Sequence, residues 1–159
     1  LPYNISSKII SKFVNNSDTI LFDNLIFMFQ KEVGDRILAN VNTSSYGRLS
    51  ILLNWRLNIK KICDIKPTSF NPKPKVDSSL IHFTFKEKYF PISNIKNLET
   101  ITRIFFNQRR KKIKKPFKQI FQNFEEISNE LKIDLNLRPQ NLDIETFCKI
   151  TEKYENLIS

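Results

Sequence analysis

The chain has few of the residues on which most enzyme chemistry depends. Only two glycines occur in 159 residues, Gly34 and Gly47, so no glycine-rich loop can hold a phosphate or a nucleotide. The one histidine, His82, cannot build a histidine metal site alone, and it completes no Ser-His-Asp or Cys-His set; we expect it to be a strand residue. These shortages exclude dinucleotide and ATP chemistry and argue against hydrolytic nucleophiles.

Cysteine is also scarce, and long apolar runs are absent. Cys63 and Cys148 have no CxxC or Cys/His companion, so we expect both to be buried apolar residues in a reducing compartment. The best candidate for a membrane span, 20–29, is interrupted by Asp23 and Asn24 and is far too short. We therefore expect a cytoplasmic protein with no membrane partner.

Against these shortages stands an excess of positive charge. Lysine and arginine together number 26 and the acidic residues 16, which gives a formal net charge of +10 and a pI near 9.7. Such a surface attracts polyanions. Nucleic acid is the expected partner, because an anionic membrane would require a basic amphipathic helix or a lipid anchor.

The first part of the chain has the pattern of an α/β sheet. Its apolar run before Lys31 is typical of a central parallel strand covered on both faces, and its last two strands, joined by a proline-rich loop, suggest an antiparallel pair at a sheet edge. We expect helices over 4–15, 31–40 and 49–57, and strands over 19–30, 60–66 and 76–86. The prediction for residues 1–89 is a mostly parallel sheet that ends in an antiparallel hairpin.

From Phe90 onward we find helical periodicity only. Three apolar stripes predict helices, the last capped by Asp143: Leu98, Ile101 and Phe105; Phe117, Ile120, Phe121 and Phe124; Ile144, Phe147, Cys148 and Thr151. We predict a small all-α domain over residues 90–159.

Two aromatic elements could carry chemistry. Leu1-Pro2-Tyr3-Asn4 is expected at a strand-to-helix turn, where open α/β sheets present site residues, although a turn proline and a packing tyrosine would look the same. In the loop 69–78, prolines brace Phe70, which could stack on a nucleobase while Lys73 and Lys75 meet phosphates. The alternative is a rigid connector with Phe70 in the core.

A third element is the basic segment 109–118, in which seven of ten residues are cations. Charge runs are often only solvated faces. Cations this crowded repel one another, however, so a phosphate backbone is the preferred interpretation, with each neutralised phosphate adding roughly 0.7 to 0.9 to the salt slope of binding.

Taken in order, these pieces resemble the KsgA/RsmA family of small-subunit ribosomal RNA adenine N6-dimethyltransferases. The opening motif is shared with many adenine methyltransferases, but Gly-Arg-Leu-Ser and Gln-Arg-Arg-Lys at this separation are specific. The residues that carry the resemblance are 1–6, 29–33 with Arg36, 46–50, 70–78 and 106–111.

The resemblance implies a Rossmann-like methyltransferase sheet of which this chain is the C-terminal portion. The S-adenosylmethionine loop and the acidic ribose-binding residue would lie upstream of Leu1, so most of the cofactor pocket would be absent. We expect the chain alone to bind S-adenosylmethionine weakly or not at all and to be inactive. Residues 1–89 would complete the methyltransferase domain, and 90–159 would form a helical RNA-recognition domain.

By resemblance, the catalytic residues are Leu1, Pro2, Tyr3 and Phe70. The target adenine would be turned out of its RNA context and held between the rings of Tyr3 and Phe70, with the Leu1 carbonyl accepting from N6. Transfer would be an in-line displacement at the sulfonium methyl, so positioning would matter more than acid or base catalysis. No catalytic histidine or carboxylate and no metal are expected.

The resemblance also gives the RNA contacts and the substrate. Besides Lys73 and Lys75, phosphates would be met by Arg109, Arg110, Lys111, Lys112 and Arg138. The expected substrate is a pair of adjacent adenosines near the 3′ end of small-subunit ribosomal RNA, within the small subunit, and the protein is expected to be a monomer. The alternatives are a non-catalytic RNA-binding or ribosome-assembly module and a mitochondrial transcription-factor relative.

Overall fold

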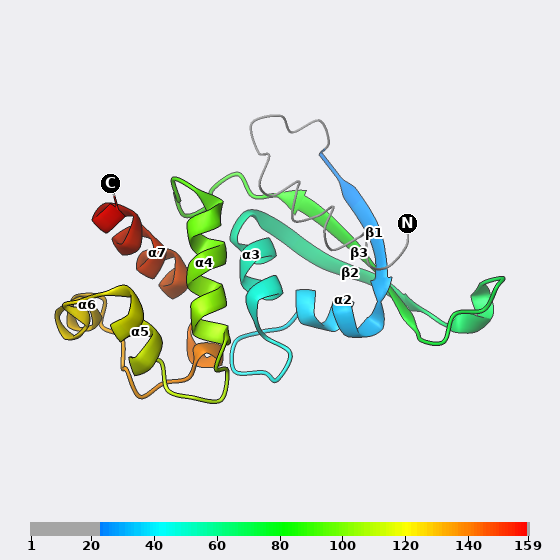
Figure 1. Cartoon of the computed structure of the whole chain (residues 1–159). Helices are drawn as coiled ribbons and strands as arrows, with labels where there is room; N and C mark the ends of the chain where they lie inside the picture. The colour runs from blue at the N-terminus through cyan, green and yellow to red at the C-terminus, as the bar shows by residue number, and fades with distance from the viewer. Residues whose placement is uncertain (1–22, 159) are drawn as a thin grey trace. The chain divides into compact units, whose positions relative to one another are not determined.

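A computed structural model describes residues 23–158 of the chain (Figure 1). They form two compact units, one of residues 23–39 and 52–89 and the other of residues 40–51 and 90–158. The elements in chain order are β1 (Leu25–Gln30), α2 (Lys31–Ile37), α3 (Arg48–Arg56), β2 (Leu57–Ile65), the 3-10 turn η1 (Pro67–Ser69), β3 (Ser78–Phe85), α4 (Ile95–Phe106), α5 (Lys114–Ile120), α6 (Phe124–Glu130), the 3-10 turn η2 (Pro139–Asn141) and α7 (Ile144–Ile158).

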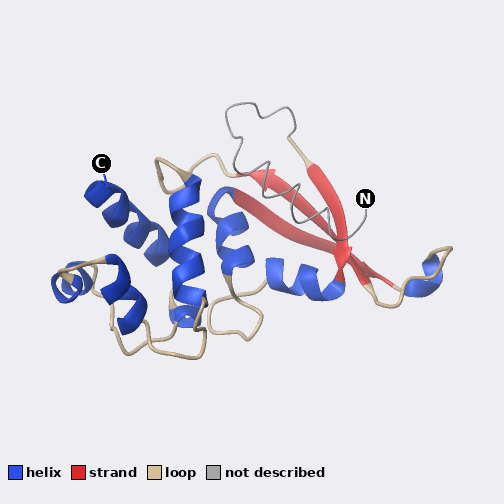
Figure 2. Ribbon diagram, viewed as in Figure 1, coloured by secondary structure: helices blue, strands red, loops and turns tan. Residues whose placement is uncertain are grey.

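The sheet of the first unit has the order β1-β3-β2 (Figure 2). β3 pairs antiparallel with both neighbours, so the predicted antiparallel hairpin of β2 and β3 is confirmed. The predicted parallel pairing of the first strand is not confirmed, since among residues 23–158 β1 is paired on one side only, antiparallel to β3, and Ile26 is 57% exposed. An apolar run indicates a strand but does not fix the direction in which that strand pairs.

Helix α2 packs tightly against the sheet. A Cβ at Gly34 would lie 2.9 Å from the Cβ of Ser79 on β3, so only glycine lets the two backbones come this close. The core beneath consists of apolar side chains on alternate strand positions, including Phe29, Ile81 and Phe83, and the rings of Phe29 and Phe83 meet edge to face at 6.0 Å.

The predicted helix 49–57 ends one residue early. Leu57 is spaced as a helical residue from Leu53, but it is the first residue of β2, where it is buried opposite Phe85. Likewise α2 ends at Ile37 instead of continuing to residue 40. Apolar spacing does not locate the end of an element, because an apolar side chain just beyond a helix can pack into the core as the first residue of the next strand.

Two helix starts in the second unit have side-chain caps. The Asp143 carboxylate accepts from the backbone N–H of Thr146 at 2.8 Å, which confirms the predicted cap of α7. The Asn94 side chain caps α4 by accepting from the N–H of Lys96 at 3.0 Å. The two helices share a core in which the ring of Phe105 lies 5.5 Å from that of Phe147.

The helix predicted from Phe117 to Phe124 is two helices. Phe121 has extended backbone angles, φ −120° and ψ 125°, and ends α5, while α6 begins at Phe124. Phe117 and Phe121 are nevertheless both buried. The i, i+3, i+4, i+7 spacing alone does not reveal the break, because side chains on either side of it can enter the same core.

The cysteines and the histidine differ in how well they were predicted. Cys148 is buried on α7, as expected, and His82 lies on β3. Cys63 is exposed, contrary to expectation, and it adjoins the point where the β2–β3 register shifts between Lys61 and Cys63. No helix among residues 23–158 is long and apolar enough to cross a membrane.

Candidate functional site

Phe70 lies on the loop between β2 and β3, which extends beyond the strand ends in Figure 1. Its N–H donates to the carbonyl of Pro67 at 3.2 Å, so η1 leads directly into it. The ring is half-buried, and Lys73 and Lys75 beyond it are exposed. The predicted partners Leu1, Pro2 and Tyr3 lie outside the described residues, so the proposed ring pair stays a prediction.

The ends of this loop, residues 66–77, are tied together. The Lys66 Nζ lies 2.7 Å from Oδ2 of Asp77. The carbonyl of Asp77 accepts from the backbone N–H of Lys31, the first residue of α2, at 2.9 Å. The loop therefore leaves the sheet at a point fixed from two sides.

Asp64 connects the strands and α2 just below the loop. Its Oδ1 accepts from the Ser79 hydroxyl at 2.6 Å, and its Oδ2 lies 3.0 Å from the Nζ of both Lys31 and Lys61. These donors, Ser79 first, hold the pKa of Asp64 well below its usual range. The hydrogen bond between Lys31 and Asp64 is also the main cause that raises the pKa of Lys31.

In the second unit, the basic segment 109–118 alternates between core and surface. Ile113, Pro116 and Phe117 are buried, whereas all its cations except Arg109 are exposed. Every ion pair among residues 23–158 uses cations outside this segment. The positive charge of the segment is therefore not neutralised by the described part of the chain.

Arg109 is the exception, because it is half-buried and its guanidinium is held by neutral groups. Nη2 donates to the carbonyl of Thr43 at 3.2 Å, and Nε donates to Oε1 of Gln140 at 3.4 Å. A Cβ at Gly47 would lie 4.0 Å from its Nη1. Arg109 thus joins three chain segments that are far apart in sequence.

These three segments are ones that the sequence had singled out. Asn42 and Asn141 are joined by a side-chain hydrogen bond of 2.8 Å, and the N–H of Asn42 donates to the carbonyl of Gln140 at 2.9 Å. Arg138, next to η2, is exposed. The Gly-Arg-Leu-Ser motif, the Gln-Arg-Arg-Lys motif and the segment around Arg138 therefore fold together in one unit.

Tyr46 supports this arrangement from inside. It is 1% exposed, and its ring packs edge to face against Phe106 with centroids 6.5 Å apart. Its hydroxyl has no hydrogen-bond partner among residues 23–158. Burial, with smaller effects of Asp143 and Cys148, raises the pKa of this hydroxyl.

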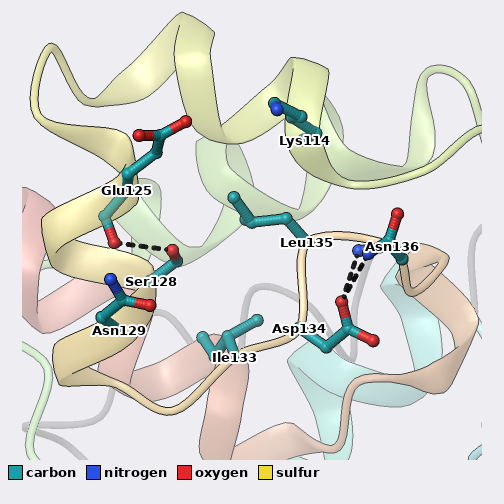
Figure 3. Close-up of a pocket in the computed structure, with 8 residues that line it drawn as sticks. All are labelled: Lys114, Glu125, Ser128, Asn129, Ile133, Asp134, Leu135 and Asn136. Atoms are coloured by element: carbon teal, nitrogen blue, oxygen red, sulfur yellow. Dashed lines mark hydrogen bonds between the residues drawn. The ribbon is translucent and has the colours of Figure 1, made fainter.

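An open pocket of about 400 Å³ lies beside the basic segment (Figure 3). It is lined by α5, α6 and the loop that follows α6, with residues Lys114, Glu125, Ser128, Asn129, Ile133, Asp134, Leu135 and Asn136. Lys112 donates to Asn136 at 2.8 Å, and Asn136 donates to Asp134. Two carboxylates and one lysine give this pocket mixed charge, in contrast to the purely cationic surface of 109–118.

Several of these residues were missed at the level of sequence. The pattern of residues 60–66 predicts a strand and gives Asp64 and Lys66 no further role; the sole signal is one acidic residue in the basic run Lys60 to Lys66. Arg109 was expected on the RNA surface with its neighbours. Its separate position depends on Thr43 and Gln140, which no local pattern could connect to it. Among residues 23–158 no cluster of His, Cys, Asp and Glu could hold a metal ion.

The residues present do not by themselves fit S-adenosylmethionine. Gly34 is placed by the contact of α2 with Ser79, and Gly47 by its position beside Arg109. The described residues therefore contain no glycine-rich turn, and the pocket on α5 and α6 is lined by charged side chains of both signs and other polar side chains, with Ile133 and Leu135 as its apolar members. No catalytic step can be derived through the cofactor from these residues.

Comparison with known proteins gives one consistent answer. A ribosomal RNA small subunit methyltransferase A of Pelagibacter ubique is 58% identical over 158 residues, 99% of this chain and 60% of the relative. The protein of the same name from Ehrlichia ruminantium is 44% identical over 151 residues, 94% of this chain and 56% of the relative. The chain thus spans about three fifths of the curated relatives that it matches.

A solved structure agrees. A dimethyladenosine transferase from Plasmodium falciparum superposes with a TM-score of 0.77 at 29% identity, covering 98% of this chain and 65% of that one. The family model of the ribosomal RNA adenine dimethylases matches residues 1–156. The chain therefore belongs to the ribosomal RNA adenine dimethylase family.

Proposed function

We propose that this chain is the substrate-side part of an enzyme that dimethylates N6 of adjacent adenosines near the 3′ end of small-subunit ribosomal RNA. The methyl donor would be S-adenosylmethionine, bound mainly by sequence upstream of Leu1. The observation that carries the proposal is the family match over residues 1–156 together with relatives named for methylation of small-subunit RNA. In this proposal the protein acts as a cytoplasmic monomer on the small ribosomal subunit.

The finer fold follows from the same proposal. β1 has a strand partner on one side only among residues 23–158, so its outer edge could accept a parallel strand from the upstream half. This would complete a mostly parallel, Rossmann-like sheet of which β2 and β3 are the antiparallel end. Residues 1–89 would belong to the methyltransferase domain, and 90–159 would form an all-helical RNA-recognition domain.

The adenine would be held between Tyr3 and Phe70, with Leu1 and Pro2 forming the turn beneath it. The half-buried ring of Phe70 supports this role, because a side chain already committed to the core could not stack on a base. Base stacking on an aromatic ring contributes about 1 to 3 kcal/mol. Lys73 and Lys75 are exposed on the same loop and suited to the flanking phosphates.

The remaining RNA contacts would come from the second unit. Arg110, Lys111 and Lys112 carry exposed side chains in a segment without ion pairs, and Arg138 is exposed on a segment to which Arg109 is hydrogen bonded. RNA in a folded ribosomal subunit is recognised mainly through shape, phosphates and unpaired bases. A cationic surface that its own protein leaves unneutralised is suited to that task.

The test joins this chain to the upstream half of the protein and measures methyl transfer to assembled small subunits. Tyr3→Ala and Phe70→Ala should each lower kcat/KM by roughly 10 to 100-fold, because each removes one stacking face. Tyr154→Ala, which alters a half-buried ring on α7, is the control. Full activity in both site variants would refute the base sandwich.

The alternative is a non-catalytic RNA-binding or ribosome-assembly module. The same joined protein distinguishes the two, because a module would bind small subunits without transferring a methyl group. Subunit binding in the absence of any methylated adenine would favour the module and reject the enzyme.

A further inference from the structure

The loop that carries Phe70 is long and is held at its base. Twelve residues, 66–77, separate β2 from β3, and the loop includes Pro67, Pro72 and Pro74. Prolines restrict local conformation but do not fix the direction in which a loop leaves a sheet. Something else must set where the Phe70 ring lies relative to the strands.

The first connection runs from Asp77 to Phe70 through Lys66. The Asp77 carboxylate pairs with the Lys66 ammonium at 2.7 Å. The carbonyl of Lys66 accepts from the N–H of Ser69 at 3.0 Å, which starts η1, and Phe70 is the next residue. The two ends of the loop are thus joined immediately before the turn that orients Phe70.

The second connection fixes Asp77 itself. Its carbonyl accepts from the N–H of Lys31, and the Lys31 ammonium reaches the Asp64 carboxylate at 3.0 Å. Asp64 and Ser79 are register partners on β2 and β3 and share a hydrogen bond of 2.6 Å. The neck of the loop is therefore tied to both strands and to α2.

Stabilisation of the fold would be a weak explanation by itself for the ion pair between Lys66 and Asp77. The Lys66 side chain is 74% exposed and that of Asp77 is 28% exposed. Exposed ion pairs contribute little to folding stability, because water screens the two charges. Such a pair can still select one orientation of the loop, because it joins the two ends of the loop next to the turn that precedes Phe70.

We propose that Lys66 and Asp77, supported by Lys31 and Asp64, are positioning residues that set the orientation of Phe70 toward the target base. This inference rests on the proposed function, in which Phe70 stacks on adenine. None of the four residues need touch the substrate. They act by limiting the positions that the ring can occupy before RNA binds.

The experiment uses the chain joined to its upstream half. Asp77→Asn and Lys66→Gln each remove the ion pair, and the double exchange Lys66→Asp with Asp77→Lys restores it with reversed polarity. Glu145→Gln on α7 is the matched control, because it breaks the exposed Glu145–Lys149 pair, in which the two groups lie 2.6 Å apart. Methyl transfer and thermal unfolding are measured for every variant.

A second readout follows the loop directly. Phe70→Trp is introduced with and without Asp77→Asn. The fluorescence anisotropy decay of the added tryptophan is obtained by subtracting the signal of the corresponding protein that keeps Phe70. Trp55 is 5% exposed and contributes the same signal to both. We expect faster local motion of the residue-70 ring when the ion pair is absent.

The expected result is a loss of kcat/KM of roughly 10-fold in the single variants, carried mainly by kcat, with an unchanged melting temperature. Recovery in the exchanged double variant would identify the pair as the cause. Activity and anisotropy unchanged in Asp77→Asn, while Phe70→Ala is inactive, would overturn the positioning role alone. Full activity of Phe70→Ala would instead overturn the proposed function on which it rests.

Discussion

At the scale of single residues, the most consequential buried charge is Glu155. It is 7% exposed, and its carboxylate accepts from the N–H groups of Ser93 and Asn94 and from the Asn97 amide at 2.9 to 3.0 Å. Burial by itself would raise the pKa of Glu155, but these donors together lower it. The Glu155 carboxylate on α7 therefore accepts hydrogen bonds from donors at and just before the start of α4.

Glu155→Gln should lower the free energy of unfolding by about 2 kcal/mol at neutral pH, because it weakens charge-assisted hydrogen bonds. Since the folded pKa lies below the unfolded one, this contribution is present above the unfolded pKa and is lost as pH falls through the folded value. Urea unfolding from pH 7 to pH 3 should show the two proteins converging toward the acidic end of this range, as Glu155 becomes protonated. Glu152→Gln, exposed on the same helix, should show no such convergence.

For Tyr46→Phe we expect no loss of stability, in contrast to Glu155→Gln. The buried hydroxyl of Tyr46 has no partner within the described part of the chain, so Tyr46→Phe removes a desolvated polar group without removing any hydrogen bond seen there. The free energy of unfolding should stay equal or rise by about 1 kcal/mol. Calorimetry that showed a loss above 1 kcal/mol would mean that the hydroxyl is satisfied in solution.

At the scale of elements, substitution by alanine is expected to have different effects at the two glycines, Gly34 and Gly47. Alanine favours a helix over glycine by about 1 kcal/mol, but at Gly34 the added Cβ would meet the Ser79 Cβ at 2.9 Å. Overpacking of this kind costs about 1 to 3 kcal/mol, and the clash is with a strand that cannot yield easily. Gly34→Ala should therefore destabilise the protein, whereas Gly47→Ala, whose nearest neighbour is 3.9 Å away, should be nearly neutral in thermal unfolding.

The sequence was sufficient to predict those features of the elements that depend on nearby residues. The cap of α7 at Asp143 and the β2–β3 hairpin were predictable, because each depends on residues close together in the chain. The antiparallel pairing of β1 was not, since it depends on β3, which comes much later in the chain, and the break at Phe121 was not, since the apolar spacing continues across it. For the same reason the position of Lys73 on an exposed loop was predictable, but the ties of Asp64 and Arg109 to distant segments were not.

At the scale of the whole molecule, the net charge of +10 matters less than its distribution. The double variant Arg110→Gln with Lys111→Gln removes two cations from the basic segment 109–118, which makes no ion pair within residues 23–158. The slope of log binding constant against log salt for single-stranded RNA should become shallower by roughly 1.4.

The control for this prediction removes the same charge elsewhere. Lys149→Gln with Lys153→Gln also lowers the net charge by two, but both lysines are paired with carboxylates, Glu145 and Glu130. Its salt slope should stay close to that of the original protein. Equal changes in both double variants would show that total charge, and not the basic segment, governs binding.

The strand order β1-β3-β2 also has a consequence for synthesis. β1 and β2 come first in the chain, yet each is hydrogen bonded only to β3 among the described strands. A nascent polypeptide that ends before Ser78 thus contains neither of these ladders, and the β1–β3 ladder is complete only once Phe83 has left the exit tunnel of the translating ribosome, the β2–β3 ladder only once Phe85 has left it.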